Sequence, residues 1–485
     1  MKRLIALISI LMLCAIHSAV AQNFEDAFNA FVQQNEQSFN RFADSINKAF
    51  AEAMEANIRT FTGEQPKVRD PKPKPVKLPE AEKKDVPKEL PSLPKPAPAE
   101  NKEPIKEPAK PTPSPAESPV ESVTPPSELL NWTEFDLFGD NIRYVKKPFP
   151  EKMKGTNPKD VSAFWIQLSE CDYEPLLQTC RTARTDRGFN DWATYQLALE
   201  MARQTYPLQY NEQAVMTVFL LNQLGLEAKV GFGNAHLFCL LAVEQQLYGL
   251  SFADMAENHY YIFELNPAYV NRDGAFSFRT YDVPFPEPTQ GLDMNVSQPL
   301  KSAEFPDIVD SAINISTSMI ELFGTYPQVD IAVYANARPS NVFCQSVEQV
   351  FQPYLRTQTT VEAVDFLLAY LQYGFDYATD EEQFGHEKPF FCEENYYYPQ
   401  NDCEDRSVLF AFLVRHLLHL DVVLIDYPGH IATAVHFNED VPGNSVMHSG
   451  KRYVICDPTY IGAPIGIEMP EFTAADRTVV PLSKR

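Results

Sequence analysis

The sequence has little positive charge for its length. Its 485 residues include 41 Lys and Arg against 65 Asp and Glu, which gives a formal net charge of −24. A protein that binds nucleic acid needs a basic face to meet the phosphate backbone, so this balance argues against a nucleic-acid partner. A cationic group on a substrate, or solubility alone, would suit the excess of acid.

Long apolar runs and metal-binding motifs are also missing. After the first 21 residues, no stretch approaches the roughly 18 to 20 unbroken apolar residues that a membrane-spanning helix requires, so we expect no transmembrane segment. The histidines and cysteines show neither HExxH nor CxxC spacing. The sequence therefore predicts no catalytic metal and indicates no other cofactor.

Cysteine is scarce, and its count is informative. The chain has eight, and removal of Cys14 with the N-terminal leader would leave seven. In an oxidising compartment an odd number leaves one thiol unpaired. Cys171 and Cys180 are near enough in sequence to pair, although the sequence alone cannot establish that connectivity. Cys403 is the natural candidate for the free thiol.

The first 21 residues have the pattern of a secretory signal peptide. Lys2 and Arg3 form a basic start, an apolar run follows over Leu4 to Ile16, and Ala19-Val20-Ala21 forms a small-residue cleavage box. We therefore expect an exported protein, located in the periplasm or outside the cell.

Residues 22–62 carry an apolar stripe at steps of three and four residues, which predicts one amphipathic helix of nearly 40 residues. Removing this stripe from water would be favourable, so we expect the helix to pair with another copy or to dock on an apolar surface. Self-association is the plainest interpretation. Lipid contact is less favoured, because the polar face has few basic residues. The stripe comprises Phe24, Phe28, Phe31, Phe39, Phe42, Ile46, Phe50, Met54, Ile58 and Phe61.

The next segment, residues 63–127, is rich in proline, lysine and glutamate. Residues 65–127 hold 18 of the 40 prolines in the chain. A segment of this composition cannot build a core, so we predict a disordered, extended and semi-rigid linker.

Near the C-terminus, Cys403, His430 and Asp457 follow one another at gaps of 27 and 27 residues. Amide acyl transfer needs a nucleophile, a base that takes its proton and a group that orients the base. A cysteine can be activated by a nearby imidazolium, and a carboxylate can fix the histidine tautomer. The order of these three residue types predicts a catalytic triad.

The local sequence around each residue fits that arrangement. Cys403 opens an apolar helical run, with Asp402 as a possible N-cap, and the positive end of a helix favours a thiolate. Residues 420–427 and 430–437 have the composition of two strands joined at a Pro-Gly turn. Asp457 ends a further strand, so one helix start and two strands could bring the three side chains together.

Residues 387–460 resemble the transglutaminase-like superfamily, whose fold is related to that of papain. In that family a Cys at a helix start, a His on the following strands and an Asp before Pro-Thr form the triad. The resemblance implies that Cys403 is the nucleophile, His430 the general base and acid, and Asp457 the orienting carboxylate. The acidic residues around the thiol depart from a favourable setting for a thiolate, because nearby negative charge opposes ionisation.

A second copy of the pattern lies upstream. Tyr210, His236 and Asn266 align with the three triad positions at offsets of 193, 194 and 191 residues, which predicts an internal duplication. A phenol with a pKa near 10 is a poor nucleophile at neutral pH, so this copy should be inert in triad chemistry. It could bind a ligand, brace the second copy, or do both.

Together these patterns divide the chain into 1–21, a signal peptide; 22–62, an amphipathic helix; 63–127, a linker; 128–300, a degenerate transglutaminase-like domain; and 301–485, one with an intact triad. The expected fold is α+β, with two tandem domains of helix packed on antiparallel sheet. The leading hypothesis is a secreted thiol enzyme that acts on a peptide or protein substrate, with hydrolysis slightly favoured over cross-linking. The alternative is a binding or scaffold protein without enzymatic activity.

Overall fold

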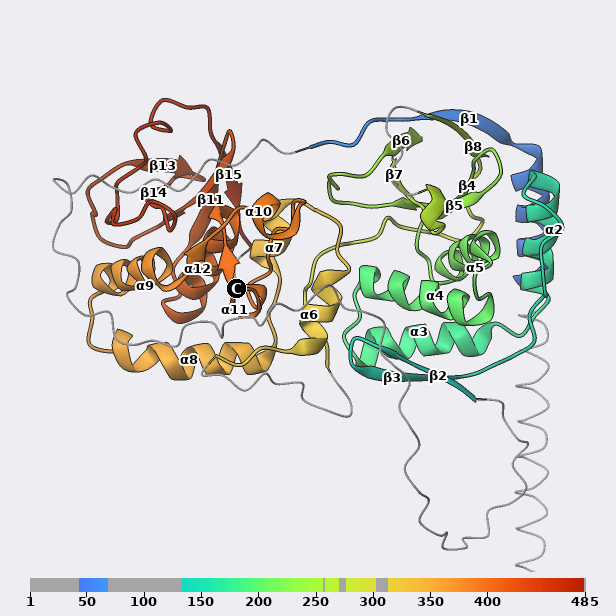
Figure 1. Ribbon diagram of the computed structural model, residues 1–485, viewed down its shortest axis with the longest axis horizontal. Helices are drawn as coiled ribbons and strands as arrows, with labels where there is room; N and C mark the ends of the chain where they lie inside the picture. Colours follow the sequence, from blue (N-terminus) through green and yellow to red (C-terminus); the bar gives the residue numbers. More distant parts are fainter. Residues whose placement is uncertain (1–42, 69–131, 256–257, 270–275, 302–312, 484–485) are drawn as a thin grey trace, which may run out of the picture.

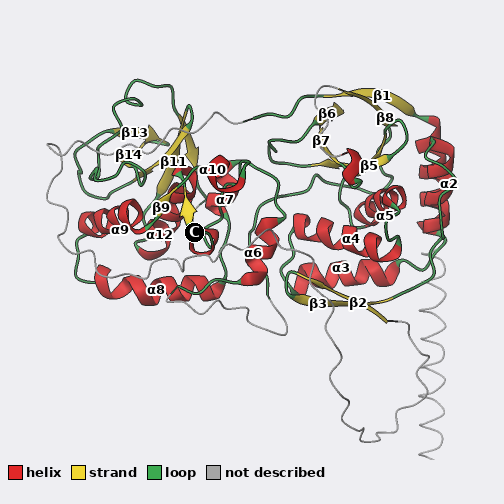
Figure 2. Cartoon of the chain, viewed as in Figure 1, coloured by secondary structure: helices red, strands yellow, loops and turns green. Residues whose placement is uncertain are grey.

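The computed structural model describes five ranges of the chain and shows two units, each with helices packed on an antiparallel sheet (Figures 1 and 2). The prediction of an α+β fold is confirmed. Within the described ranges, no helix is both long and apolar enough to cross a membrane. The predicted signal peptide and nearly all of the predicted linker lie outside these ranges, which are 43–68, 132–255, 258–269, 276–301 and 313–483.

The first unit has a mostly helical layer and a six-stranded sheet. Its helices are α2 (Pro158–Ser169), α3 (Glu174–Asp186), α4 (Asp191–Thr205) and α5 (Tyr210–Gln223). The sheet runs in the order β1 (Ile58–Gly63), β8 (Phe276–Tyr281), β4 (Ala228–Phe232), β5 (Leu237–Ala242), β7 (Asn258–Phe263) and β6 (Phe252–Met255). A hairpin of β2 (Trp132–Leu137) and β3 (Asp140–Val145) and the short 3-10 helix η2 (Pro267–Tyr269) complete the unit.

The second unit contains a five-stranded sheet in the order β13 (Ser445–His448), β14 (Lys451–Cys456), β12 (His430–Val435), β11 (Val422–Tyr427) and β15 (Thr478–Pro481). A short parallel pair joins β9 (Asp376–Tyr377) and β10 (Gln400–Asn401). The helices are α6 (Thr317–Gly324), α7 (Ile331–Asn336), α8 (Asn341–Leu355), α9 (Thr360–Gly374), α10 (Asp380–Phe384), α11 (Glu394–Tyr397) and α12 (Cys403–Leu417).

The two large sheets share one strand order. Each unit places a helix, α5 or α12, before five strands, and the fifth strand pairs with the first, which is followed across the sheet by the second, fourth and third. In both sheets every pairing is antiparallel. A common strand order is what an internal duplication would produce.

The second sheet is covered on both faces. Alternate residues of a strand point to opposite faces. Ile431 and Val435 accordingly join the core that includes α12, whereas Ala432 and Ala434 join a second cluster with residues of the segment that connects β14 to β15, among them Phe472. The end of β12 that carries His430 therefore lies between a central helix and an outer covering segment.

The expectation of a single helix over residues 22–62 is wrong at its C-terminal end. Residues 43–56 are helical, but Ile58 and Phe61 lie on β1, which pairs with β8 along its whole length. Threonine, isoleucine and phenylalanine favour strands, and the edge of β8 offers backbone hydrogen bonds that a surface helix cannot use. Residues 22–42 of the predicted helix lie outside the described part of the chain.

The helical residues 43–56 belong to the core of the first unit. Phe50 is 2% exposed and its ring lies 5.2 Å from that of Trp165 on α2 and 5.6 Å from that of Tyr281 on β8. Trp165 also donates from Nε1 to Asn47 Oδ1 at 3.2 Å. The predicted boundary at residue 128 is therefore wrong as well, because the first unit includes chain from both sides of the proline-rich segment.

The two units are joined through the chain between α6 and α7. Trp192 Nε1 of the first unit donates to Thr325 Oγ1 at 2.9 Å, and Asn190 Nδ2 donates to the Tyr326 hydroxyl at 2.7 Å. The Gln246 backbone N–H donates to Asp330 Oδ2 at 3.1 Å. The two units therefore contact each other through this segment.

Candidate active site

Cys403 is the first residue of α12. The backbone N–H of Asp402, at the N-cap, donates to Asp405 Oδ2 at 3.1 Å, which fixes the entry into the helix. The Cys403 side chain lies where the helix dipole favours negative charge, and the residue is 1% exposed. The sequence Asp-Cys-Glu-Asp therefore sets both the start of the helix and the position of the thiol.

His430 and Asp457 meet at one end of the second sheet. His430 begins β12 and Asp457 directly follows β14, and these strands are antiparallel neighbours with Thr433 opposite Cys456. His430 Nε2 lies 2.9 Å from Asp457 Oδ2. The two residues are 2% and 3% exposed, so this is a buried imidazole–carboxylate pair.

Backbone groups hold the Asp457 carboxylate in place. Its Oδ1 accepts hydrogen bonds from the Thr459 N–H at 2.9 Å and from the Tyr460 N–H at 3.3 Å. Donors on one oxygen leave the other directed at His430. The Asp-Pro-Thr-Tyr turn thus orients the carboxylate that in turn orients the imidazole.

Gln372, a buried residue on α9, is a part of this site that the sequence did not reveal. Its Nε2 donates to the Asp457 carbonyl at 3.1 Å and to the Ala463 carbonyl at 3.0 Å. Its Oε1 accepts from the Gly462 N–H at 3.0 Å. The only sequence signal is an amide on an otherwise apolar helix face, which does not identify a partner 85 residues away.

Phe472 is a second residue that the sequence did not reveal. Its ring stacks on the His430 imidazole with centroids 4.9 Å apart and planes 14° from parallel. Tyr427 lies near both rings, with its centroid 5.0 Å from that of Phe472 and 6.0 Å from that of His430. Glu468 accepts from the Tyr427 hydroxyl at 2.5 Å and pairs with Arg477 at 2.6 Å, which fixes the covering segment.

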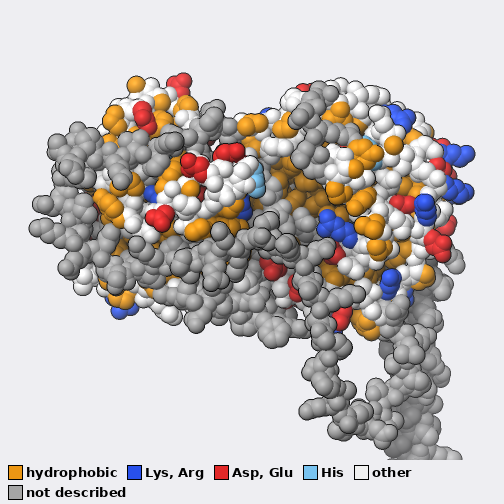
Figure 3. Space-filling model, in the orientation of Figure 1, with side chains coloured by type: hydrophobic (Ala, Val, Ile, Leu, Met, Phe, Trp, Pro, Cys, Tyr) orange, Lys and Arg blue, Asp and Glu red, His pale blue; other side chains and the backbone are white. Residues whose placement is uncertain are grey.

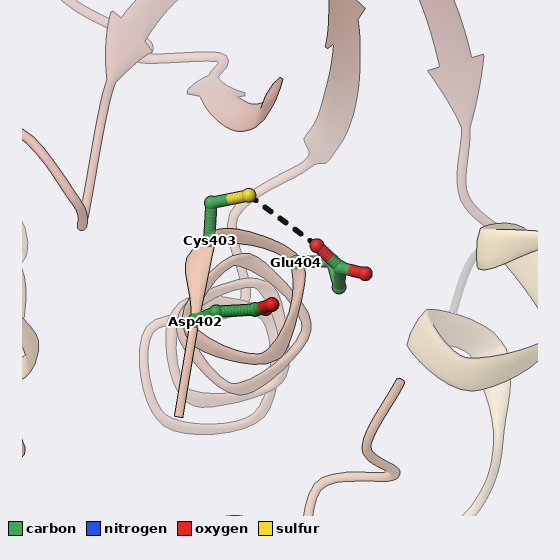
Figure 4. A group of neighbouring side chains, drawn as sticks. All are labelled: Asp402, Cys403 and Glu404. Atoms are coloured by element: carbon green, nitrogen blue, oxygen red, sulfur yellow. Dashed lines mark hydrogen bonds between the residues drawn. The ribbon is translucent and has the colours of Figure 1, made fainter. Parts of the chain in front are cut away.

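The thiol of Cys403 is hydrogen-bonded to a neighbouring carboxylate. Cys403 Sγ donates to Glu404 Oε2 at 3.3 Å, as Figure 4 shows. His430 Nδ1, the ring nitrogen not used by Asp457, is buried without a hydrogen-bond partner among the described residues. In this arrangement the thiol proton lies toward Glu404, and the imidazole is not yet hydrogen-bonded to the sulfur.

Acidic side chains cluster around the start of α12. Three groups of potential ligand atoms lie within 4.8 Å of one another: Asp402 with Cys403 and Glu404; Asp380 with Asp402 and Asp405; and Asp380 with Glu387 and Glu404. Two of these carboxylates also bind backbone, because Asp405 Oδ1 accepts from the Phe390 N–H and Asp380 Oδ2 from the Lys388 N–H, both at 2.8 Å. Such groups could hold a cation, so the absence of a metal remains a prediction.

The first unit contains a comparable imidazole–carboxylate pair. Tyr210 begins α5, and His236 precedes β5, as the alignment of the two copies predicted. The carboxylate that reaches His236 comes from Glu264, whose Oε1 lies 2.8 Å from Nε2, and not from the aligned position Asn266. Asn266 Oδ1 instead accepts from the Ala268 N–H at 3.0 Å. This unit therefore has a carboxylate at its histidine, two residues before the aligned position.

No protein-family model matches this sequence. No curated protein matches it either.

The cysteines are all free thiols in the described part of the chain. The suggested pairing of Cys171 and Cys180 is not formed. Cys171 Sγ donates to the Gln167 carbonyl at 3.1 Å, and Cys180 is buried next to Met201. Burial raises the pKa of the Cys180 thiol to about 12, so this residue is unreactive.

Proposed function

We propose that the protein is a transglutaminase-like thiol enzyme that attacks an amide or peptide bond through an acyl-enzyme at Cys403. The single observation that carries the proposal is the 2.9 Å pair of His430 and Asp457, at the end of the sheet on which the cysteine-bearing helix packs. The shared strand order supports the further proposal that the chain holds two tandem domains of this kind.

The proposed reaction uses each group in turn. The thiol turns from Glu404, its proton passes to His430 Nδ1, and the sulfur attacks the substrate carbonyl. His430 then returns the proton to the leaving amine as the carbon–nitrogen bond breaks. Asp457 stabilises the imidazolium between these steps. A second nucleophile then opens the thioester, and water is slightly favoured because nothing obvious marks a site for an acceptor amine.

The acidic surface near the thiol indicates the class of substrate. On the face shown in Figure 3, acidic side chains gather over α10, where Glu381 and Glu382 are exposed. α10 also supplies Asp380 to the acidic groups beside the thiol. We infer a peptide or protein substrate that presents a cationic group. The leader at residues 1–21 supports a substrate located in the periplasm or outside the cell.

A scaffold function is the second candidate. It is favoured by the burial of Cys403, His430 and Asp457, each no more than 3% exposed, and by the tyrosine at the cysteine position of the first unit. A scaffold would bind a partner without forming an acyl-enzyme.

The test combines thiol labelling with substrate profiling. Cys403→Ala should abolish activity against peptides and cell-wall fragments while the circular dichroism spectrum is unchanged, because only the nucleophile is removed. Asp457→Asn should reduce kcat/KM by about 10²–10⁴-fold, since the imidazole loses its orienting partner. Full activity in Cys403→Ala, or the absence of one fast-labelling thiol in the wild-type protein, would end the thiol-enzyme proposal in favour of the scaffold.

A further inference from the structure

Arg406 is a buried cation one helical turn beyond Cys403 on α12. It is 1% exposed, and it donates from Nε to Asn401 Oδ1 at 2.8 Å and from Nη2 to the Phe375 carbonyl at 2.9 Å. The guanidinium carbon also lies 5.3 Å from the centre of the Tyr377 ring. A buried charge is costly and adds little stability by itself, so its retention beside a candidate nucleophile calls for an explanation.

The surroundings of the thiol are otherwise unfavourable for ionisation. Asp402 and Glu404 approach it directly. Asp380 and Glu387 lie against Glu404 from α10 and the loop that follows it. Each ionised carboxylate opposes a negative charge on sulfur, because like charges in a buried site raise the cost of the second one.

Arg406 is placed to counter these charges. Side chains three residues apart on a helix are neighbours, at about 5–6 Å between Cβ atoms. Nη1 of Arg406 is buried and has no hydrogen-bond partner in the described part of the chain. Burial lowers the pKa of Arg406 from its ordinary value, while charge interactions with Tyr377, Asp402, Asp405 and Cys403 oppose that shift. A buried guanidinium thus lies within one helical turn of the thiol on the same helix.

We propose that Arg406 supplies the positive charge that allows Cys403 to exist as a thiolate within its acidic surroundings. This inference rests on the proposed function. Arg406 acts through the thiol, so it is a positioning residue and not a catalytic one. His430 supplies a second positive charge only while it is protonated, whereas a guanidinium is charged at every working pH. The alternative is a purely structural role, in which Arg406 only holds Asn401 and the Phe375 carbonyl in place.

The experiment measures the rate at which iodoacetamide alkylates Cys403 in the full chain between pH 5 and pH 10, with the labelled peptide identified by mass spectrometry. Arg406→Met should slow alkylation at pH 7 about tenfold or more, because one pKa unit of the thiol is a tenfold change in thiolate. Arg406→Lys keeps the charge and should stay within about threefold of wild type. Arg415→Met is the matched control, because Arg415 is also buried on α12 but at its other end, where it donates to the Ala335 carbonyl.

Arg406→Gln keeps the proposal falsifiable if Arg406→Met does not fold. Its amide can still donate a hydrogen bond to Asn401 or to the Phe375 carbonyl but carries no charge, so it should slow alkylation as much as Arg406→Met does. Unchanged alkylation in a folded Arg406→Met or Arg406→Gln, or a tenfold loss in Arg406→Lys, overturns the role assigned to Arg406. A wild-type Cys403 that reacts no faster at pH 7 than free cysteine overturns the proposed function itself.

Discussion

At the scale of residues, the site consists of side chains that carry the proposed chemistry and side chains that hold them. Cys403, His430 and Asp457 could be predicted because each has a local signal: a helix start, a turn before a strand, and an Asp-Pro-Thr sequence after one. Gln372, Phe472 and Glu264 could not, because their partners are brought to them by tertiary packing. Sequence patterns pointed to the three residues of the proposed triad, and the structure added the groups that contact them.

The hydrogen bonds that Gln372 makes to the loop after Asp457 can be tested by substitution. Gln372→Leu leaves the carbonyls of Asp457 and Ala463 and the Gly462 N–H without their partner, and each unsatisfied buried group costs about 1–3 kcal/mol. We expect the Asp457 loop to shift, with a fall in kcat/KM of about 10²-fold, which is the usual effect of misplacement near 1 Å. Gln349→Leu on α8 is the control, because Gln349 is exposed. Equal activity in the two variants would show that Gln372 does not orient Asp457.

At the scale of elements, one buried carboxylate joins the starts of two helices. Glu393 accepts hydrogen bonds from the Ser316 N–H at 2.8 Å, at the N-cap of α6, and from the Ser340 N–H at 2.5 Å, at the N-cap of α8. Burial raises the pKa of Glu393 to about 7, although these hydrogen bonds act in the opposite direction. The folded protein therefore favours the neutral carboxyl more than the unfolded chain does.

This shift predicts a pH dependence of stability. The contribution of Glu393 is fully present below the ordinary pKa of 4.5 and is lost as the pH rises through about 7. The loss should amount to at most about 3 kcal/mol, from 1.36 kcal/mol per pKa unit. The free energy of unfolding from urea titrations at pH 5, 6, 7 and 8 should fall as the pH rises in the wild type. It should fall less steeply with pH in Glu393→Gln, whatever the absolute stability of that variant. Glu439→Gln, at an exposed position, should keep the wild-type slope, and identical slopes in all three proteins would contradict the prediction.

The elements also show why one sequence pattern was misread. Steps of three and four predicted helix through Phe61, yet Ile58 to Gly63 form β1. Hydrophobic spacing over so short a segment does not separate helix from strand, and the deciding factor, the free edge of β8, lies more than 200 residues away. The strands around His430 and Asp457 were easier to predict, because turn residues mark their ends.

At the scale of the whole molecule, the order of domains differs from the expected sequence of helix, linker and two domains. Residues 43–63 and the chain from β2 onward belong to the same unit, although the proline-rich segment separates them in sequence. The predicted linker does not set residues 43–62 apart from the folded units, because they belong to one of them. Self-association through residues 22–42 stays a prediction, because those residues lie outside the described ranges.

Truncation tests this organisation. A chain beginning at residue 43 should keep the near-ultraviolet circular dichroism and the melting temperature of the mature protein. A chain beginning at residue 126 lacks β1 and the buried Phe50, Ala51 and Met54, and burying one large apolar side chain is worth about 1.5–3 kcal/mol. We expect it to unfold at a much lower temperature or to aggregate. Equal melting temperatures for the two chains would refute the place of residues 43–63 in the core. Light scattering on the chain that begins at residue 43, compared with the mature protein, shows whether residues 22–42 are needed for association.

Because residues on both sides of the proline-rich segment belong to the first unit, a single proteolytic cut in that segment should leave the folded protein in one piece. Val68 and Trp132 flank the proline-rich segment, and the chain on both sides of it belongs to the same unit, where the Glu64 backbone N–H donates to the Phe252 carbonyl at 2.6 Å. A protease that breaks one peptide bond between those residues would create two fragments, yet it would cut none of the contacts that join β1 to β8 or Phe50 to Trp165. The nicked protein should therefore migrate as one particle under native conditions and as two bands after denaturation.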